Sequence, residues 1–192
     1  SQQKDQEAEA AYNRAIQLQG GMEPAFLAHY SLATHLMQKA RRQFEAKQVS
    51  PALESLEVAA RQIEQSVKEM RWTAPNVIDT RVSVHESLGA AREADGDIKG
   101  AMEVYEFACT LPGGSRANYR AGILIGKMAA DAWAKRRPSE ALGYFIKARE
   151  RISATKELPQ GVSPSQRVEY LSYLDQTIAF LKGAKIEPPA AK

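Results

Sequence analysis

The sequence predicts an all-α protein, and three observations favour this fold class. Helix start and stop signals recur along all 192 residues, and apolar residues between them repeat at helical spacing. Alternation of apolar and polar residues with a period of two, as expected of strands, is hard to find. Hydrophobic residues make up 44% and charged residues 26%, as in ordinary folded domains.

The first half of the chain predicts four helices. Their expected spans are 5–18, 24–47, 51–70 and 75–94. Pro24 and Pro75 head the second and fourth, because a proline at the first helical position loses no hydrogen bond. Ser50 before Pro51 is expected to cap the third. Gly96, which can adopt the left-handed conformation, is expected to end the fourth.

The second half predicts four more helices. Their expected spans are 98–110, 116–135, 138–154 and 164–183, with a loop at 155–163. Asp97 is expected to cap the first, and the turn Pro112-Gly113-Gly114-Ser115 precedes the second. Pro138 heads the third. Ser163 and Gln166 have the spacing of a capping box at the start of the last.

A small–large–small pattern recurs on four alternate helices, at spacings of four and three residues. The four copies are Ala8-Tyr12-Ala15, Ala52-Leu56-Ala59, Ala101-Tyr105-Ala108 and Ala141-Phe145-Ala148. This spacing places all three side chains on one stripe of a helix. The small residues then allow a neighbouring helix to approach closely, and the large residue fills the space beside it.

The pattern resembles the tetratricopeptide repeat. The best copy contains Leu88-Gly89, Gly96-Asp97, the triplet that begins at Ala101, and Pro112. His85 and Arg92 stand where the family usually has aromatic residues. The resemblance implies a right-handed α-α superhelix, a solenoid of helical hairpins, as one array over 1–183. Its parts are a half repeat at 5–18, repeats at 24–70, 75–110 and 116–154, a capping helix at 164–183 and a flexible tail at 184–192.

The resemblance also implies a function: a peptide or protein segment binds in a concave groove lined by the first helix of each hairpin. The implied groove residues are Tyr30, Met37, Arg41, Phe44, Glu86, Glu93, Tyr119 and Trp133. For Phe44 and Trp133, packing between repeats is an equal alternative. The two glutamates favour a partner with basic and apolar side chains. The family's clamp for C-terminal carboxylates uses lysine and asparagine, which these positions lack.

The main alternative is a structural module that self-associates through its terminal helices, as a homodimer. The last expected helix has an apolar stripe, and Tyr170, Tyr173 and Phe180 form a second one roughly opposite. At the other end, Tyr12 and its alanines have no preceding first helix to cover them. We therefore expect further sequence upstream or cover by another copy.

The sequence shows no recognisable pattern of residues for catalysis, for cofactor binding or for metal binding. This predicts a non-enzymatic protein without a cofactor or a metal ion. His29 and His35, six residues apart on one helix, point in different directions and are expected at the surface or in the groove. The single cysteine, Cys109, excludes an internal disulfide and is expected to be buried. Gly122 and Gly126 precede Lys127 but lie inside a helix, so they predict close helix packing rather than a phosphate loop.

The net charge of +3 is small for a nucleic-acid-binding protein. Two short basic clusters, 39–42 and 135–137, lie at helix ends, where positive charge opposes the helix dipole. We therefore do not expect nucleic acid as a partner. No apolar run reaches the roughly 18 residues of a membrane span. The compartment stays open, with a lean towards the cytoplasm, and an upstream signal that has been removed is compatible with the sequence.

Overall fold

The computed structural model describes residues 2–18, 25–70 and 74–183. Every regular element in these ranges is helical, which confirms the predicted class. The elements are α1 (Gln2–Leu18), α2 (Phe26–Glu45), α3 (Val49–Glu69), α4 (Pro75–Asp95), α5 (Ile98–Thr110), the short 3-10 helix η1 (Gly114–Arg116), α6 (Ala117–Ala134), α7 (Pro138–Ser153) and α8 (Pro164–Gly183). Helices that are neighbours in the chain pack on one another from α1 to α5 and from α6 to α8.

Most of the predicted helix signals act as expected. Gly96 is left-handed, with a φ of 88°, and ends α4. The side chain of Asp97 accepts a hydrogen bond from the backbone N–H of Gly100 (2.9 Å) and so caps α5. At α8, the N–H of Gln166 donates to Ser163 Oγ (3.2 Å), and the N–H of Ser163 donates to Gln166 Oε1 (2.8 Å). This reciprocal pair is the predicted capping box.

The prediction that Ser50 caps the third helix is wrong. Helix α3 begins at Val49, and the residue before it, Gln48, is the N-cap. The N–H of Gln48 donates to the carbonyl of Gln43 (2.8 Å), which closes a tight turn and lets the helix begin early. Pro51 is tolerated because the first-turn N–H groups have no partner within the helix. Pro24 and the tail 184–192 lie outside the described residues.

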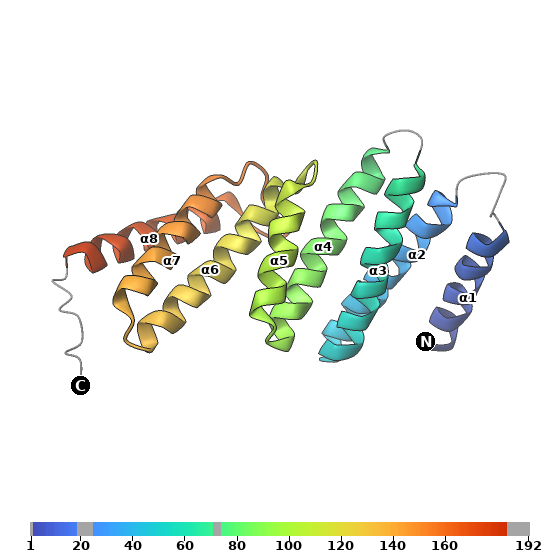
Figure 1. Ribbon diagram of the computed structural model, residues 1–192, viewed down its shortest axis with the longest axis horizontal. Helices are drawn as coiled ribbons and strands as arrows, with labels where there is room; N and C mark the ends of the chain where they lie inside the picture. Colours follow the sequence, from blue (N-terminus) through green and yellow to red (C-terminus); the bar gives the residue numbers. More distant parts are fainter. Residues whose placement is uncertain (1, 19–24, 71–73, 184–192) are drawn as a thin grey trace. The chain divides into compact units, whose positions relative to one another are not determined.

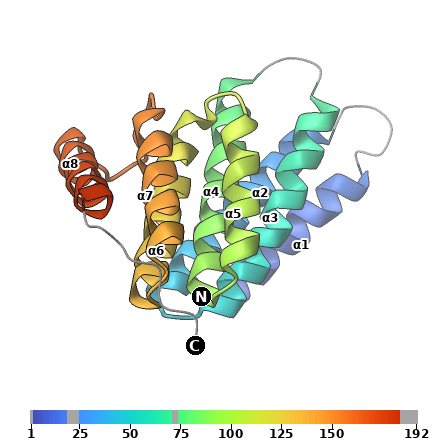
Figure 2. The same ribbon diagram turned by 60° about the vertical axis from the view of Figure 1, so that its left-hand side comes forward.

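The chain forms two compact units, unit 1 (1–113) and unit 2 (114–192). In unit 1, each helix from α1 to α4 packs on the next, and α2 also contacts α4. The pairs α2–α3 and α4–α5 are antiparallel hairpins (Figure 1). In unit 2, α6 and α7 lie side by side and α7 packs on α8 (Figure 2). The single array over 1–183 stays a prediction, and each unit is described separately.

Close helix packing in unit 1 depends on the predicted small residues. Ala52 and Ala59 of α3 are fully buried, as are Ala101 and Ala108 of α5. The buried ring of Tyr105 lies against Gly89 of α4, where an added Cβ would come within 2.6 Å of it. In α1 the three triplet residues are only half-buried, as expected of a helix without cover on one side.

Unit 2 is packed by the same means. Ala141, Phe145 and Ala148 of α7 are buried, and a Cβ at Gly122 of α6 would collide with Ile152 of α7. A Cβ at Gly126 would collide with the hydroxyl of Tyr170 on α8. The two glycines therefore allow close approach of neighbouring helices, as predicted. The apolar stripe of α8 is buried through Leu174, Ile178 and Leu181.

The three hairpins close with the same turn. In each, one residue between the two helices is left-handed: Lys47 (φ 59°), Gly96 (φ 88°) or Arg136 (φ 57°). It lies two residues beyond the end of α2 and of α6, and one residue beyond the end of α4. In each, the next residue donates its N–H to a carbonyl five residues back: Gln48 to Gln43, Asp97 to Arg92, and Arg137 to Ala132. This is the longer hydrogen bond of the Schellman motif.

Candidate functional site

The predicted groove residues of α2 form a row along one side of the helix. Tyr30, Met37 and Phe44 follow one another at intervals of seven residues and are half-buried at the border of the core of unit 1. Arg41 lies beside this row, and its exposed guanidinium pairs with Glu45 (Nε–Oε1 3.3 Å). The row is thus part core and part surface. Phe44 packs on the core of unit 1, and its place in a binding groove stays a prediction.

The predicted glutamates lie on α4, which contacts α2 within the same unit. Glu86 and Glu93 are both half-buried and are also seven residues apart, so they share one stripe of α4. The hydroxyl of Tyr105 donates a hydrogen bond to Glu93 Oε2 (3.4 Å). The structure thus brings six of the eight predicted groove residues onto two neighbouring helices of unit 1.

The other two predicted groove residues, Tyr119 and Trp133, lie on α6 in unit 2. Tyr119 is buried, whereas Trp133 is 46% exposed near the end of the helix. Tyr170 of α8 packs over Gly126, which lies between them in the sequence. Burial raises the pKa of the Tyr170 hydroxyl, and the neighbouring Tyr173 and Tyr119 raise it further.

The three residues predicted for self-association have different environments on α8. Tyr170 is half-buried against α6, and its ring stacks on Tyr173 with centroids 5.9 Å apart. Tyr173 and Phe180 are 50% and 64% exposed. Because they are seven residues apart, they share the outward side of α8. Of the three residues predicted for the second apolar stripe, two are therefore exposed, and Tyr170 is not.

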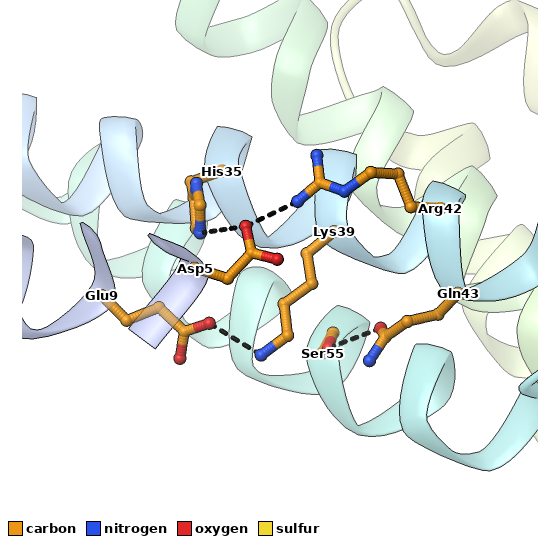
Figure 3. Close-up of polar contacts among 7 residues, drawn as sticks. All are labelled: Asp5, Glu9, His35, Lys39, Arg42, Gln43 and Ser55. Atoms are coloured by element: carbon orange, nitrogen blue, oxygen red, sulfur yellow. Dashed lines mark hydrogen bonds and ion pairs between the residues drawn. The ribbon is translucent and has the colours of Figure 1, made fainter. Parts of the chain in front are cut away.

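A cluster of ion pairs that sequence reasoning missed joins α1 to α2 (Figure 3). Lys39 Nζ lies 2.7 Å from Glu9 Oε1, and Arg42 Nη2 lies 2.6 Å from Asp5 Oδ1. His35 Nε2 lies 3.6 Å from the same oxygen of Asp5. The sequence does contain the spacing of this cluster. Asp5 and Glu9 are four residues apart on one helix, and His35, Lys39 and Arg42 follow at intervals of four and three residues on the next.

A second missed cluster joins α3 to α4. Glu64 Oε1 accepts hydrogen bonds from Arg81 Nε (2.7 Å) and His85 Nε2 (2.9 Å), and Oε2 accepts one from Arg81 Nη2 (2.6 Å). The ring of Phe107 on α5 covers the cluster, 4.7 Å from the His85 ring centroid. Partial burial raises the pKa of Glu64, but these hydrogen bonds and the charge of Arg81 outweigh it and lower the pKa to about 2.

The histidines lie at contacts between helices. His29 and His85 are buried, and His35 is half-buried. His29 and His35 do point in different directions: His29 Nδ1 is hydrogen-bonded to Gln62 Oε1 on α3 (2.5 Å), whereas His35 faces α1. A surface position is wrong for His29 and His35, because each ring fills a contact between helices, and the alternative position in the groove stays a prediction. Cys109 is half-buried rather than buried.

The basic clusters that suggested nucleic acid have partners within the protein. In the first, Lys39 and Arg42 pair with α1. In the second, Lys135 pairs with Asp131 (2.7 Å) and Arg137 with Glu140 (3.5 Å). Residue pairs at such spacing on one helix are typical of a solvated helix surface.

In the part of the chain that the structure describes, no three histidine, cysteine, aspartate or glutamate side chains lie close enough to hold a metal ion. Within the same residues, no helix combines the length and apolar character needed to cross a bilayer.

The chain matches no model of a known protein family, and it shows no significant similarity to proteins of curated function. The tetratricopeptide resemblance therefore depends on this chain's own residues. These residues form an apolar and aromatic row on α2 and include two carboxylates on the neighbouring helix α4. Such groups suit contact with apolar and basic side chains.

Proposed function

We propose that this protein is a non-enzymatic scaffold, a tetratricopeptide-like array of helical hairpins that binds a peptide or protein segment along the first helix of each hairpin. The partner carries apolar side chains for the row on α2 and lysine or arginine for the glutamates of α4. In the third hairpin, a partner would make contact at the exposed Trp133 of α6, whereas Tyr119 of the same helix is buried.

The repeated hairpin supports the proposal. Three hairpins share the same left-handed turn and the same hydrogen bond across it. Their second helices carry the same buried triplet, with Leu56, Tyr105 and Phe145 as the large residues. Because a hairpin of this kind cannot bury its apolar faces alone, stacking hairpins into an array is the arrangement that covers them.

The observation that carries the binding proposal is the contact between α2 and α4 in unit 1. It places the half-buried row of Tyr30, Met37 and Phe44 next to the helix that bears Glu86 and Glu93. Aromatic, methionine and arginine side chains are enriched in protein interfaces, and a few of them usually supply most of the binding energy.

The surface is also preorganised. Glu93 is held by the hydroxyl of Tyr105, whose ring is fixed against Gly89 in the core. The α2 row is anchored because each of its side chains packs partly on the core. Little side-chain entropy is then lost when a partner binds, which improves affinity without further contacts.

Selection from a library of random peptides tests the proposal. We expect the full chain to select peptides rich in basic and apolar residues, and the E86K/E93K variant to lose this preference. E54K/E103K, with the same charge change on exposed positions of α3 and α5, should select the same peptides as the unmodified chain. If E86K/E93K also selects them, the glutamates do not recognise the partner and the proposal is wrong.

A second candidate function, self-association, is favoured by the exposed aromatic pair Tyr173 and Phe180 on α8. If this pair forms an interface, a concentration-dependent dimer should be lost in Y173S/F180S and kept in V168S, which removes an exposed apolar residue elsewhere on the helix. Sedimentation equilibrium measures the mass of both variants. An unchanged mass for Y173S/F180S would exclude this interface. Tyr170 is left in place because it packs on Gly126.

A further inference from the structure

The attachment of α1 differs from that of the other helices in unit 1. The α1 helix packs mainly on α2, and none of the side chains described at 3–18 is buried, whereas α2, α3, α4 and α5 each contribute buried residues. A helix with few buried apolar contacts opens at a lower free energy than the core. The α1 helix is therefore the element of unit 1 that separates most readily.

Ion pairs hold α1 on α2, and they form only when the docking helix carries negative charge opposite the positive charge of α2. The contact stripe of α1 presents Asp5 and Glu9 to three cationic or imidazole side chains of α2, which we call the basic face of α2: His35, Lys39 and Arg42 (Figure 3). A helix that carried lysines at the two carboxylate positions would meet like charges instead.

The same stripe continues into apolar contacts one turn further along. The ring of Tyr12 lies 6.0 Å from the ring of His35, and Tyr12 and Ile16 pack against the core of unit 1. Counted from Asp5 as the first position, the contact stripe of α1 has carboxylates at the first and fifth positions and apolar residues at the eighth and twelfth. The α1 helix of a second copy has this pattern, because its sequence is identical.

The connection between α1 and α2 is long enough for exchange. Residues 19–24 join Leu18 to Ala25, and an extended chain of this length spans about 24 Å. This is close to the length of α1 itself, about 26 Å for 17 residues. Exchange of an identical element between two copies makes a closed dimer from existing contacts, without a newly evolved surface.

We propose that α1 is an exchangeable helix, and that the basic face of α2 binds α1 of a second copy of this chain to form a reciprocal dimer. This dimer is separate from the proposed peptide-binding surface and from the aromatic pair of α8. It uses the side of α2 that bears Lys39 and Arg42, while the row of Tyr30, Met37 and Phe44 stays available to a partner.

Two full-length charge-reversal variants test the exchange. In D5K/E9K both helices of the contact are basic, and in K39E/R42E both are acidic, so neither variant can form the contact within a chain or between like chains. A mixture of the two restores two complementary contacts in one heterodimer. We expect native mass spectrometry to find twice the 21.2 kDa mass in the mixture and single chains in each variant alone.

A matched control separates the contact from general attraction between oppositely charged chains. R61E/K68E has the same charge change on exposed positions of α3, and its own α1 is already docked. Mixing it with D5K/E9K creates no additional contact, so it should stay single. Circular dichroism checks that each variant is helical. If the helical variants remain single chains when D5K/E9K and K39E/R42E are mixed, the exchange does not occur.

A labelled peptide of residues 2–18 provides a second test, which does not depend on mixing two variants. In D5K/E9K, charge repulsion weakens the docking of the chain's own α1, so the peptide should bind at least tenfold more tightly than to the unmodified chain. Adding K39E/R42E to D5K/E9K restores docking within the chain and should remove the gain. Equal affinity for D5K/E9K and the unmodified chain would overturn the proposal.

Discussion

At Gly89, a single hydrogen atom occupies the place of a side chain because the ring of Tyr105 lies there. An added Cβ would come within 2.6 to 2.9 Å of three ring atoms, and the ring is fully buried and cannot turn aside. The glycine is thus required by packing, although glycine within a helix is otherwise unfavourable. The tetratricopeptide resemblance had placed Leu88-Gly89 at this position.

Gly89→Ala should therefore lower the free energy of unfolding by about 1–3 kcal/mol, because the α4–α5 hairpin must separate to admit the methyl group. Gly143→Ala is the matched control. No atom lies within 4 Å of a Cβ at that position in α7, so the higher helix propensity of alanine should increase stability by about 0.5–1 kcal/mol. Chemical denaturation measures both. Equal effects would contradict the packing argument.

The left-handed residues of the turns provide a second test at this scale. Lys47 and Arg136 adopt positive φ with a side chain attached, and Gly96 adopts it without one. Lys47→Gly and Arg136→Gly should each stabilise the protein by roughly 0.5–1 kcal/mol, because the strain of the left-handed conformation exceeds the added entropy of glycine in the unfolded chain.

Alanine at these positions keeps the strain, so Lys47→Ala should give no such gain. Gly96→Ala should destabilise the α4–α5 hairpin by about 1 kcal/mol. Thermal unfolding followed by circular dichroism compares the four variants. Loss of stability in both glycine variants would show that the turns do not depend on backbone strain in this way.

At the scale of the helix, the seam between α3 and α4 depends on the ionised form of Glu64. Its pKa is lowered from 4.5 to about 2 by His85 and Arg81. The stabilisation it provides is therefore complete above pH 4.5 and is lost as the pH falls from 4.5 towards 2. Because its side chain is 28% exposed, we expect solvent to reduce the contribution to about 1–2 kcal/mol.

Glu64→Gln should consequently be less stable than the unmodified chain at pH 6, and the difference should shrink as the pH is lowered to 3. Urea unfolding at several pH values measures it. Glu54→Gln, an exposed position on the same helix, should show a small difference that does not vary with pH. A pH-independent difference for Glu64→Gln would mean that the carboxylate charge does not stabilise the seam.

The same scale shows what sequence reasoning can and cannot predict. Gly96, Asp97, Ser163 and Gln166 act on backbone groups within a few residues, so their effects are readable from local sequence and the helix ends follow. The contacts of Glu64 with Arg81, and of Asp5 with Arg42, join residues 17 and 37 positions apart. They require the register of one helix on another, which the sequence pattern alone does not specify.

The histidines show the same limit. His29 was expected at the surface or in the groove, but it fills a seam in which Gln62 of α3 is its hydrogen-bond partner. His85 is buried in the same way beside Glu64 of α3. Of the candidate site, the tetratricopeptide resemblance implied the residues on α2 and α4, and those seven residues apart do share a side of their helix. It did not predict how far each is buried, which depends on neighbouring helices.

At the scale of the whole molecule, one hairpin design occurs three times, with a common turn and a common buried triplet, in two compact units. The second helices, α3, α5 and α7, supply the buried triplets. The first helices, α2, α4 and α6, carry the residues proposed to meet a partner. This division of roles is the central claim of the proposed function.

Mapping a bound peptide by nuclear magnetic resonance tests that claim most directly. A basic and apolar peptide that the protein selects from the library is titrated into isotope-labelled protein, and the chemical shifts of the backbone amides are followed. We predict that the largest changes occur on α2 and α4, around Met37, Arg41, Glu86 and Glu93. Changes confined to α3, α5 and α8, with these four residues unaffected, would contradict the account.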